Sequence, residues 1–186
     1  MNLTNRNKPM NRRNANQNED KSSREYQEQL LQRSRGFFLT IIIFTVINLV
    51  LLVLNKGTYF LFSASIPYYL TGLSLVMDGG AVGQNAAVAL GASAVLLGFY
   101  LLCWLLSARK PVWLTIGICI FAGDTAALIY VCLKLLESPL DGLFDLLIHA
   151  LLIWEMSKGV TAENFAELAA ANSTDPGSKD NGGLYT

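Results

Sequence analysis

Charged residues are nearly absent from the middle of this chain. They make up 15% of its 186 residues, whereas hydrophobic residues make up 52%. Residues 36–55, 57–77 and 79–108 carry no charge at all, and residues 111–133 carry only Asp124. A helix needs about 20 mostly apolar residues to span a bilayer, so runs of this length exclude an ordinary soluble domain. The sequence therefore predicts an all-α membrane protein with one membrane domain between two polar tails.

Motifs for catalysis and for metal binding are also lacking. The chain has a single histidine, His149, and its cysteines (Cys103, Cys119 and Cys132) all lie within apolar runs. No HExxH, CxxC or GxxxxGK(S/T) motif occurs, and an odd number of buried thiols does not suit a disulfide framework. One intramembrane histidine gives no basis for a Ser-His-Asp arrangement. We therefore expect a protein that is not an enzyme, takes no cofactor and binds no nucleic acid.

Basic residues border the apolar runs instead of interrupting them. Arg33 and Arg35 precede the first run, Arg109 and Lys110 separate two later runs, and Lys158 follows the last. Basic flanks favour the cytoplasmic side of a membrane, so all of them are expected inside, together with both termini. The sequence predicts a four-transmembrane-helix bundle in the plasma membrane. The predicted helices are residues 36–55, 84–107, 112–134 and 141–158.

Residues 57–77 form the ambiguous run. Its length would permit a fifth span, but residues 55–57 would then be a very short turn, and Pro67 would interrupt the helix. A fifth span would also move Arg109 and Lys110 to the outer side. We therefore predict that residues 57–77 form an outer segment that lies in the interface or re-enters the membrane partway.

The polar tails carry weaker signals. Basic residues outnumber acidic ones in the cytoplasmic tail predicted at residues 1–35, which is expected to form a short juxtamembrane helix at residues 25–35. Such a tail either contacts anionic lipid or is a solvated topology signal. After the membrane domain at residues 36–159, the tail at residues 160–186 is predicted to be largely disordered, with a short helix at residues 162–171.

Ionisable residues interrupt the last two runs. Asp141, Asp145 and His149 recur every four residues and therefore share one face of the last helix. Asp124 lies midway along the preceding helix, at the depth of His149, and the two are expected to pair because an unpaired buried charge is strongly disfavoured. For the candidate cluster of Asp124, Asp145 and His149, three interpretations stay open. They are a polar contact that locks the two helices together, a proton or cation path, and a metal site.

Two further polar residues need partners. Asn48 in the first predicted helix is a buried amide, for which an interhelical hydrogen bond is expected. Trp154 and Glu155 fall near the predicted inner interface. There we expect Glu155 to meet Arg109 or Lys110 in an exposed ion pair of little energetic value.

Small residues recur every four positions on two of the predicted helices. Stripes of this kind let backbones approach closely, either inside the bundle or across a homodimer face. The stripe residues are Gly83, Ala87 and Gly91 on one helix, and Gly123 and Ala127, with Ala122 and Ala126, on the next. Both explanations stay open.

Three stretches of the chain are distinctive. They are TYFLFSASIPYYL at residues 58–70, YLLCWLLS at residues 100–107 with Lys110-Pro111, and residues 141–159. Over about residues 37–160 the chain resembles a family of small, uncharacterised multi-pass membrane proteins of Gram-positive bacteria. The resemblance implies a bacterial plasma-membrane address and supplies no catalytic residues.

The sequence favours a structural or interaction role, as an accessory component of a larger membrane complex. Its partners would be the lipid bilayer, another membrane protein or a second copy of the chain. The alternative is a small proton- or cation-coupled carrier or channel component that uses Asp124, Asp145 and His149.

Overall fold

The computed structural model describes residues 12–134 and 142–172. Within these ranges the chain forms five α-helices and no strand, which confirms the predicted all-α fold. The helices are α1 (Arg12–Val53), α2 (Ser65–Met77), α3 (Gln84–Leu106), α4 (Val112–Lys134) and α5 (Leu143–Asn172). Asp141 and the last part of the C-terminal tail, residues 173–186, lie outside the described residues.

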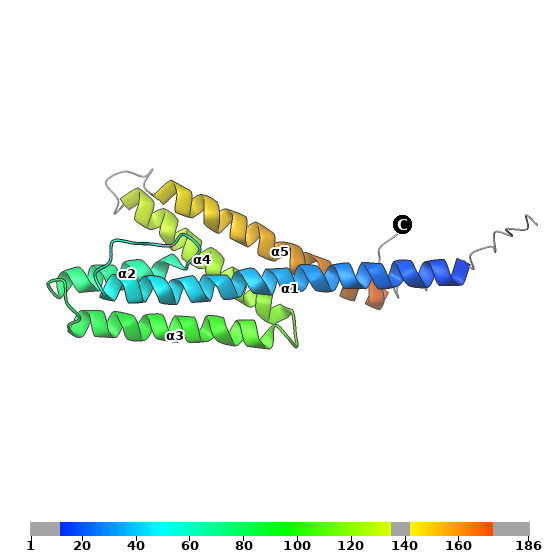
Figure 1. The fold of residues 1–186 in the computed structure, drawn as a ribbon, viewed down its shortest axis with the longest axis horizontal. Coiled ribbons are helices and arrows are strands. Elements are labelled where there is room, and N and C mark those ends of the chain that lie inside the picture. The colour runs from blue at the N-terminus through cyan, green and yellow to red at the C-terminus, as the bar shows by residue number, and fades with distance from the viewer. Residues whose placement is uncertain (1–11, 135–141, 173–186) are drawn as a thin grey trace, which may run out of the picture.

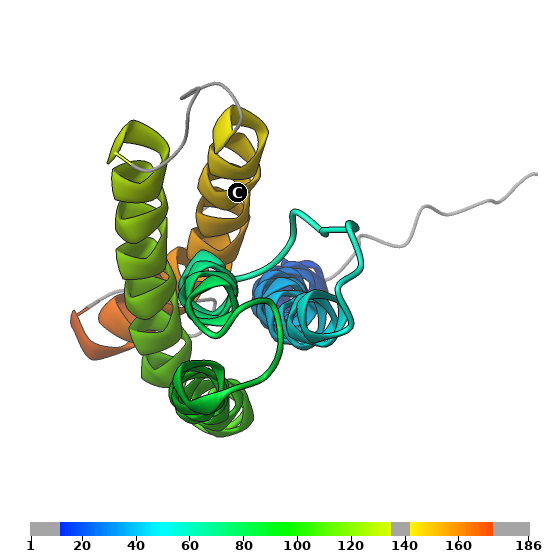
Figure 2. The same ribbon diagram turned by 90° about the vertical axis from the view of Figure 1, so that its left-hand side faces the viewer.

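The four long helices run along the length of the molecule, and α2 lies among them (Figure 1). α1 extends well past the other helices at its N-terminal end. After α1 the chain turns back into the bundle, and α2 then runs from the middle of the bundle toward the end at which α1 stops. Figure 2 shows α2 between α1 and α4 and above α3, and α2 packs against all three. A short helix therefore occupies the centre of one half of the bundle.

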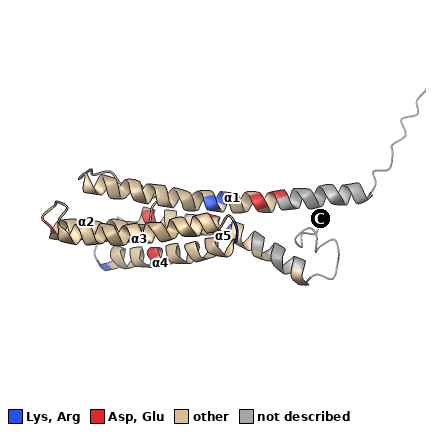
Figure 3. Ribbon diagram, turned by 90° about the horizontal axis from the view of Figure 1, so that it is seen from below, with Lys and Arg blue, Asp and Glu red and all other residues tan. Residues whose placement is uncertain are grey.

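Three of the helices are long and apolar enough to cross a membrane. Their apolar spans are Glu25–Val53 in α1, Gln84–Leu106 in α3 and Val112–Lys134 in α4. α5 is not among them, and Asp145, Glu155 and Lys158 interrupt its apolar stretch. Figure 3 shows few charged residues between the two ends of the bundle. The three helices suggest a membrane protein, whereas length and composition do not show the span predicted at residues 141–158.

The first and last helices are longer than the sequence predicts. The juxtamembrane helix expected at residues 25–35 is part of α1, and the short helix expected at residues 162–171 is the end of α5. α1 and α5 cross at Gly159 of α5. A Cβ atom on Gly159 would lie 2.8 Å from the carbonyl oxygen of Leu30 and would also collide with Ser34. Glycine therefore permits a close crossing that any side chain would disturb.

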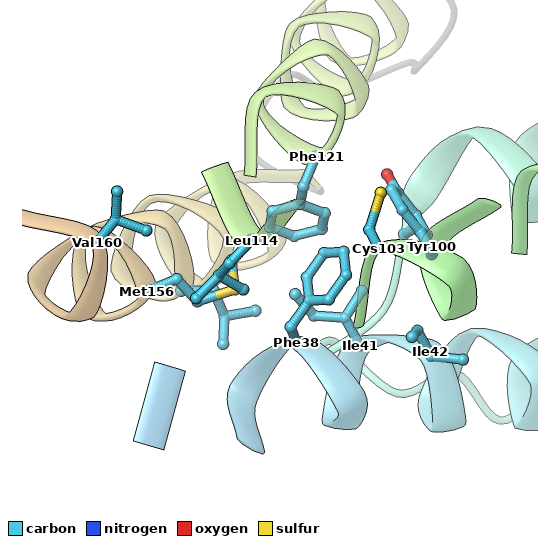
Figure 4. Packing of buried hydrophobic residues seen from close by; sticks show 11 residues of the cluster. Phe38, Ile41, Ile42, Tyr100, Cys103, Leu114, Phe121, Met156 and Val160 are labelled. Carbon is cyan, nitrogen blue, oxygen red and sulfur yellow. The ribbon is translucent and has the colours of Figure 1, made fainter. Parts of the chain in front are cut away.

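Large apolar side chains pack together inside the bundle and extend to the start of α2 (Figure 4). Phe38, Tyr100, Leu114 and Phe121 come from three different helices and are all fully buried. The rings of Phe38 and Tyr100 pack edge to face, with 5.4 Å between their centroids. A Cβ atom on Gly117 would lie 2.5 Å from Cζ of Phe38, so the ring fits in this dense core only against a glycine.

A tight turn joins α2 to α3 and places an acidic cap. Gly79 and Gly80 have φ angles of 76° and 87°, in the left-handed region that favours glycine. Asp78 Oδ2 accepts a hydrogen bond from the backbone N–H of Ala86 at 2.7 Å, and Oδ1 accepts one from the Asn85 side-chain amide at 2.7 Å. These bonds, above all the one from Ala86, favour the carboxylate and lower the pKa of Asp78.

Candidate functional site

The start of α2 lies against the middle of α4, at Asp124. Asp124 is 1% exposed, and its carboxylate accepts two backbone hydrogen bonds. Oδ2 accepts from the N–H of Ser65 and Oδ1 from the N–H of Ile66, both at 2.7 Å. The first N–H groups of a helix lack partners within the helix, and the positive end of the helix dipole lies there. Asp124 therefore binds the N-terminus of α2 with both of its oxygens.

Each backbone N–H at the start of α2 has an identified acceptor. The N–H of Ala64 donates to Oγ1 of Thr45 in α1 at 2.8 Å. The next two N–H groups donate to Asp124. The next residue, Pro67, has no N–H to satisfy. A proline that argues against a continuous fifth span is thus well suited to the first turn of a short buried helix.

Asn48 of α1 holds the non-helical stretch that precedes α2. The side chain is fully buried, and its Oδ1 accepts a hydrogen bond from the N–H of Phe60 at 2.9 Å. Its Nδ2 donates to the carbonyl oxygen of Phe60 at 2.8 Å and to Oγ of Ser63 at 2.7 Å. The expected bond from Asn48 to another helix is therefore wrong. The amide instead satisfies the peptide groups of a segment that has no helical bonds of its own.

His149 of α5 faces the same stretch from the other side. The imidazole is fully buried and stacks on Phe121, with 4.6 Å between the ring centroids. Nε2 lies 3.0 Å from the carbonyl oxygen of Ser63 and 3.3 Å from Oγ of Ser65. Nδ1 lies 3.0 Å from Oγ1 of Thr125 in α4. The imidazole thus connects α4, α5 and the segment that leads into α2.

These contacts restrict where the imidazole hydrogens lie. A carbonyl oxygen only accepts, so the Nε2 beside Ser63 must carry a hydrogen. The Thr125 hydroxyl donates its one hydrogen either to Nδ1 or to the carbonyl oxygen of Phe121, 2.9 Å away. In the first case a neutral imidazole is fully satisfied, and in the second Nδ1 also needs a hydrogen. Rotation of one hydroxyl group is therefore coupled to the protonation state of His149.

Asp145 completes the cluster, one helical turn before His149. It is 4% exposed, and its Oδ2 accepts a hydrogen bond from the Tyr59 hydroxyl at 2.9 Å. Its Oδ1 lies 3.7 Å from Nε2 of His149 and has no hydrogen-bond partner within the described part of the chain. A buried polar atom without a partner is costly. Asp145 is the least satisfied member of the cluster.

The structure brings the three candidate residues together. Oδ2 of Asp124 lies 4.0 Å from Nδ1 of His149, although the closer bonds of Asp124 go to α2. Asp145 lies beside His149 on the same helix. Asp141, the other residue expected on that face, lies outside the described residues. Among the side chains that the structure describes, no group of three or more His, Cys, Asp and Glu residues is arranged to hold a metal ion, so the structure does not support a metal site there.

Several hydroxyl residues belong to the site but did not stand out in the sequence. A serine or threonine in an apolar run is a weak signal, because its hydroxyl can bond to the carbonyl one helical turn earlier. Thr45 and Thr125 both make that bond and also bind a second group in the site. The remaining hydroxyls come from Tyr59, Ser63 and Ser65, whose pairing with distant helices depends on the path of a non-helical segment.

Glu155 does not have the partner that the sequence predicts. It pairs with Arg33 at 3.3 Å and with Lys158 at 2.7 Å. The expected pairing with Arg109 or Lys110 is therefore wrong. α1 packs directly against α5 and supplies the nearer guanidinium group.

Most residues of the small-residue stripes of α3 and α4 face outward, and Gly83 and Ala127 are half-exposed. Ala87 and Gly91 of α3 are exposed, and so is Gly123 of α4. A Cβ atom on Gly91 or Gly123 would meet nothing within 4 Å. Close packing of these stripes inside the bundle is therefore wrong, and a face for another helix is the explanation that stays open.

Comparisons with known proteins do not assign the chain to a family. No protein-family model matches the chain, and no curated protein or solved structure does. The resemblance to membrane proteins of Gram-positive bacteria stays a prediction. A functional proposal therefore has to rest on the polar cluster, the helix ends and the exposed faces.

Proposed function

We propose that this chain is a multi-pass plasma-membrane protein in which α1, α3, α4 and α5 all span the bilayer. Three of these spans are supported by length and composition. α5 is included because it packs against α1 and α4 and because its ionisable Asp145 and His149 are buried. Ionisable groups within a span are tolerated where they face the interior of the bundle.

Both ends of the chain are proposed to lie on the cytoplasmic side. Nε of Arg35 donates to Oγ of Ser107 at 3.0 Å, and Arg33 pairs with Glu155 at 3.3 Å. These contacts join the start of the apolar part of α1 to the end of α3 and to the C-terminal part of α5. Most of the described basic residues near the bundle thus lie at one end, with Lys56 and Lys134 at the other, and the more basic end favours the cytoplasm.

Residues 57–77 are proposed to re-enter the membrane from the outer side. The start of α2 bonds to Thr45, which lies about 12 Å along α1 from its C-terminal end. Non-helical backbone at membrane depth is tolerated where protein groups satisfy it. Asn48, Thr45 and Asp124 supply those groups here. A segment that lies only on the membrane surface would not place its backbone N–H groups against acceptors this deep in the bundle.

The role that this geometry supports best is a structural or interaction component of a membrane complex, without enzymatic activity. One observation carries it: the buried side chains of Asn48 and Asp124 bind backbone groups of the re-entrant segment. These side chains therefore fix the conformation of that segment. The exposed Ala87 and Gly91 leave a face of α3 on which another helix can pack closely.

Co-purification after gentle extraction tests this role. The tagged chain is expected to bring down another membrane protein or a differently tagged copy of itself. Gly91→Leu fills the exposed α3 face and should reduce the yield of that partner. Gly36→Leu is the matched control, because it adds the same side chain to open space on α1. A wild-type chain that stays alone and conducts ions would count against the role.

Labelling of single cysteines tests the orientation. In a variant without the native cysteines, a cysteine beside Asp78 should react with a membrane-impermeant maleimide added outside. A cysteine beside Arg109 should react only after the membrane is permeabilised. Labelling of both positions from one side would exclude the four-span arrangement.

A proton or cation path is the second candidate, favoured by the state of Asp145. Its Oδ1, without a partner in the described ranges, lies 3.7 Å from His149, whose protonation is coupled to the Thr125 hydroxyl. On the other side Asp145 bonds to Tyr59, whose ring lies 4.6 Å from that of Tyr68. Acids and imidazoles in series at membrane depth serve as proton relays.

Flux measurements in proteoliposomes test the second candidate. Asp145→Asn should abolish a pH-dependent flux that the wild type carries, and so should His149→Ala in protein that keeps its helices by circular dichroism. Asp124→Asn is a poor probe of flux, because Asp124 also holds α2. A wild type without flux, or variants with unchanged flux, would exclude the path.

A further inference from the structure

A groove lies between α1 and α5 at the basic end of the bundle. Its volume is about 510 Å³, which falls in the range of about 300–1,000 Å³ that small-molecule sites occupy. Tyr26 and Leu30 of α1 line one side, and Trp154, Lys158 and Thr161 of α5 line the other. The groove is separate from the polar cluster and from the exposed α3 face.

The groove forms because the two helices touch at one place and leave room beside it. The contact is at Gly159, whose Cβ atom, if present, would lie 2.8 Å from the carbonyl oxygen of Leu30. Trp154, Lys158 and Thr161 are three to four residues apart, so they share the face of α5 beside that contact. Both walls are thus set by the helix crossing.

The groove has the apolar side chains of Leu30 and Trp154 on its walls and Lys158 at its rim. Nζ of Lys158 lies 3.7 Å from the ring centroid of Trp154 and donates to Glu155 at 2.7 Å. Arg33 also pairs with Glu155, so two cations share this carboxylate. A lysine ammonium group has three N–H donors, of which Glu155 takes one. The rim can therefore still bind an anion.

The position of the groove indicates the class of ligand. Leu30 in the groove is five residues before Arg35, which binds the end of α3, so in the proposed orientation the groove lies near the inner headgroups. Trp154 is 61% exposed, and exposed indole rings favour this level of a membrane. Anionic lipids of the cytoplasmic leaflet attract lysine and arginine there. Such a lipid offers a phosphate to the rim and a hydrocarbon chain to the apolar side chains.

We propose that this groove binds an anionic glycerophospholipid, with its phosphate at Lys158 and the upper part of an acyl chain against Leu30 and Trp154. A free phosphate would leave the apolar side chains in water. A zwitterionic lipid brings a cation of its own close to the rim. The proposal rests on the membrane placement given above but not on the accessory role, so the two can fail separately.

Native mass spectrometry of the full chain tests the proposal. The chain is inserted into nanodiscs with equal amounts of phosphatidylglycerol and phosphatidylcholine that have the same acyl chains, and the retained lipids are counted. The wild type should prefer phosphatidylglycerol about 5-fold, the effect of one lysine near an anionic surface. Lys158→Gln should abolish the preference. Lys110→Gln is the matched control at the same end of the bundle, outside the groove, and should keep it.

A second variant separates the groove from its charge. Thr161→Trp fills the groove without a change of charge and should also abolish the preference, while circular dichroism reports whether each variant keeps its helices. An unchanged preference in both groove variants would overturn the proposal, and so would an equal loss in Lys110→Gln. Displacement of the lipid by inorganic phosphate would assign the groove to a soluble anion and overturn it too. A chain that does not insert into nanodiscs would refute the membrane placement and this proposal with it.

Discussion

Replacing Asp124 with leucine removes the acceptor for two backbone N–H groups at the start of α2. Both groups are bonded at 2.7 Å, and the carboxylate is 1% exposed, so water has little access to replace it. Leucine has the same branched shape and leaves no cavity, but its methyl groups are bulkier than the carboxylate oxygens. Asp124→Leu therefore removes the cap and also crowds the site, whereas Asp124→Asn keeps the volume nearly unchanged.

The expected loss follows from the two stranded groups. An unsatisfied buried donor costs about 1–3 kcal/mol, so the pair would cost about 2–6 kcal/mol. The variant no longer buries a carboxylate, which offsets part of this cost, and we expect a net loss of about 2–3 kcal/mol. Asp124→Asn keeps one acceptor oxygen and should lose about 1–2 kcal/mol. The order of stability should be wild type, then Asp124→Asn, then Asp124→Leu.

The native cysteines provide the assay. Cys103 and Cys132 are buried, and Cys119 is exposed. In a Cys119→Ser background, a fluorogenic maleimide reacts when heat exposes the two buried thiols. A loss of about 2–3 kcal/mol should lower the midpoint temperature by about 4–12 °C for a chain of this size.

The matched control is Asp78→Asn. Asp78 makes the same kind of bond, to the N–H of Ala86 at the start of α3, but at the end of the bundle where water can replace it. Its effect should be clearly smaller than that of Asp124→Leu. Equal midpoints for Asp78→Asn and Asp124→Leu would refute the argument that burial makes the Asp124 cap essential.

Two further outcomes can be measured in the same assay, and a third by circular dichroism, because thiols hardly react with maleimides at acidic pH. Gly117→Ala puts a Cβ atom 2.5 Å from Cζ of the fully buried Phe38 and should destabilise the chain by about 1–3 kcal/mol. Asn48→Ala removes the acceptor of the part-buried Phe60 N–H and leaves the Phe60 carbonyl oxygen only the Ser63 hydroxyl as a donor. It should cost about 1–3 kcal/mol, with faster protease cleavage between α1 and α2. Asp78 has a pKa lowered from 3.8, chiefly by the N–H of Ala86, so its contribution to stability is complete above about pH 4 and is lost as the pH falls through the folded pKa. Asp78→Asn should remove this acid-dependent component of a pH titration, whereas an unchanged titration would contradict it.

The depth and face of the polar residues could be predicted from spacing, because helix geometry is local and regular. Asp145 and His149 are one turn apart, and their side chains lie together as expected. Asp124 is on another helix, yet its depth follows from the fixed rise per residue, and it does come within 4.0 Å of His149. Its main partners could not be predicted, because they are backbone N–H groups of a segment whose path no periodic pattern describes.

The predictions for the partner of Glu155 and for the small-residue stripe of α3 were also wrong. Several cations lie at the end of the bundle that holds Glu155. Arg33 is the arginine that pairs with it because α1 packs directly against α5, and the sequence does not show which helices are neighbours. α3 has small residues on more than one face, so a small-residue stripe does not reveal which face is buried. The buried small residues are Ala86, Ala89 and Ser93, one or two positions away from the predicted stripe.

Asp124 and Asp145 lie in the same cluster, but the geometry gives them opposite roles. Both oxygens of Asp124 are bonded to α2, whereas one oxygen of Asp145 lacks a partner in the described ranges. Asp145→Asn keeps an acceptor for the Tyr59 hydroxyl and removes a poorly compensated buried charge, so its stability should equal or exceed that of the wild type. Asp124→Asn should be less stable, for the reason given above. If Asp145→Asn were destabilised as much as Asp124→Asn, Asp145 would be a second structural anchor. If it is not, Asp145 is kept ionisable at a cost in stability, and any transport activity should be sought there first.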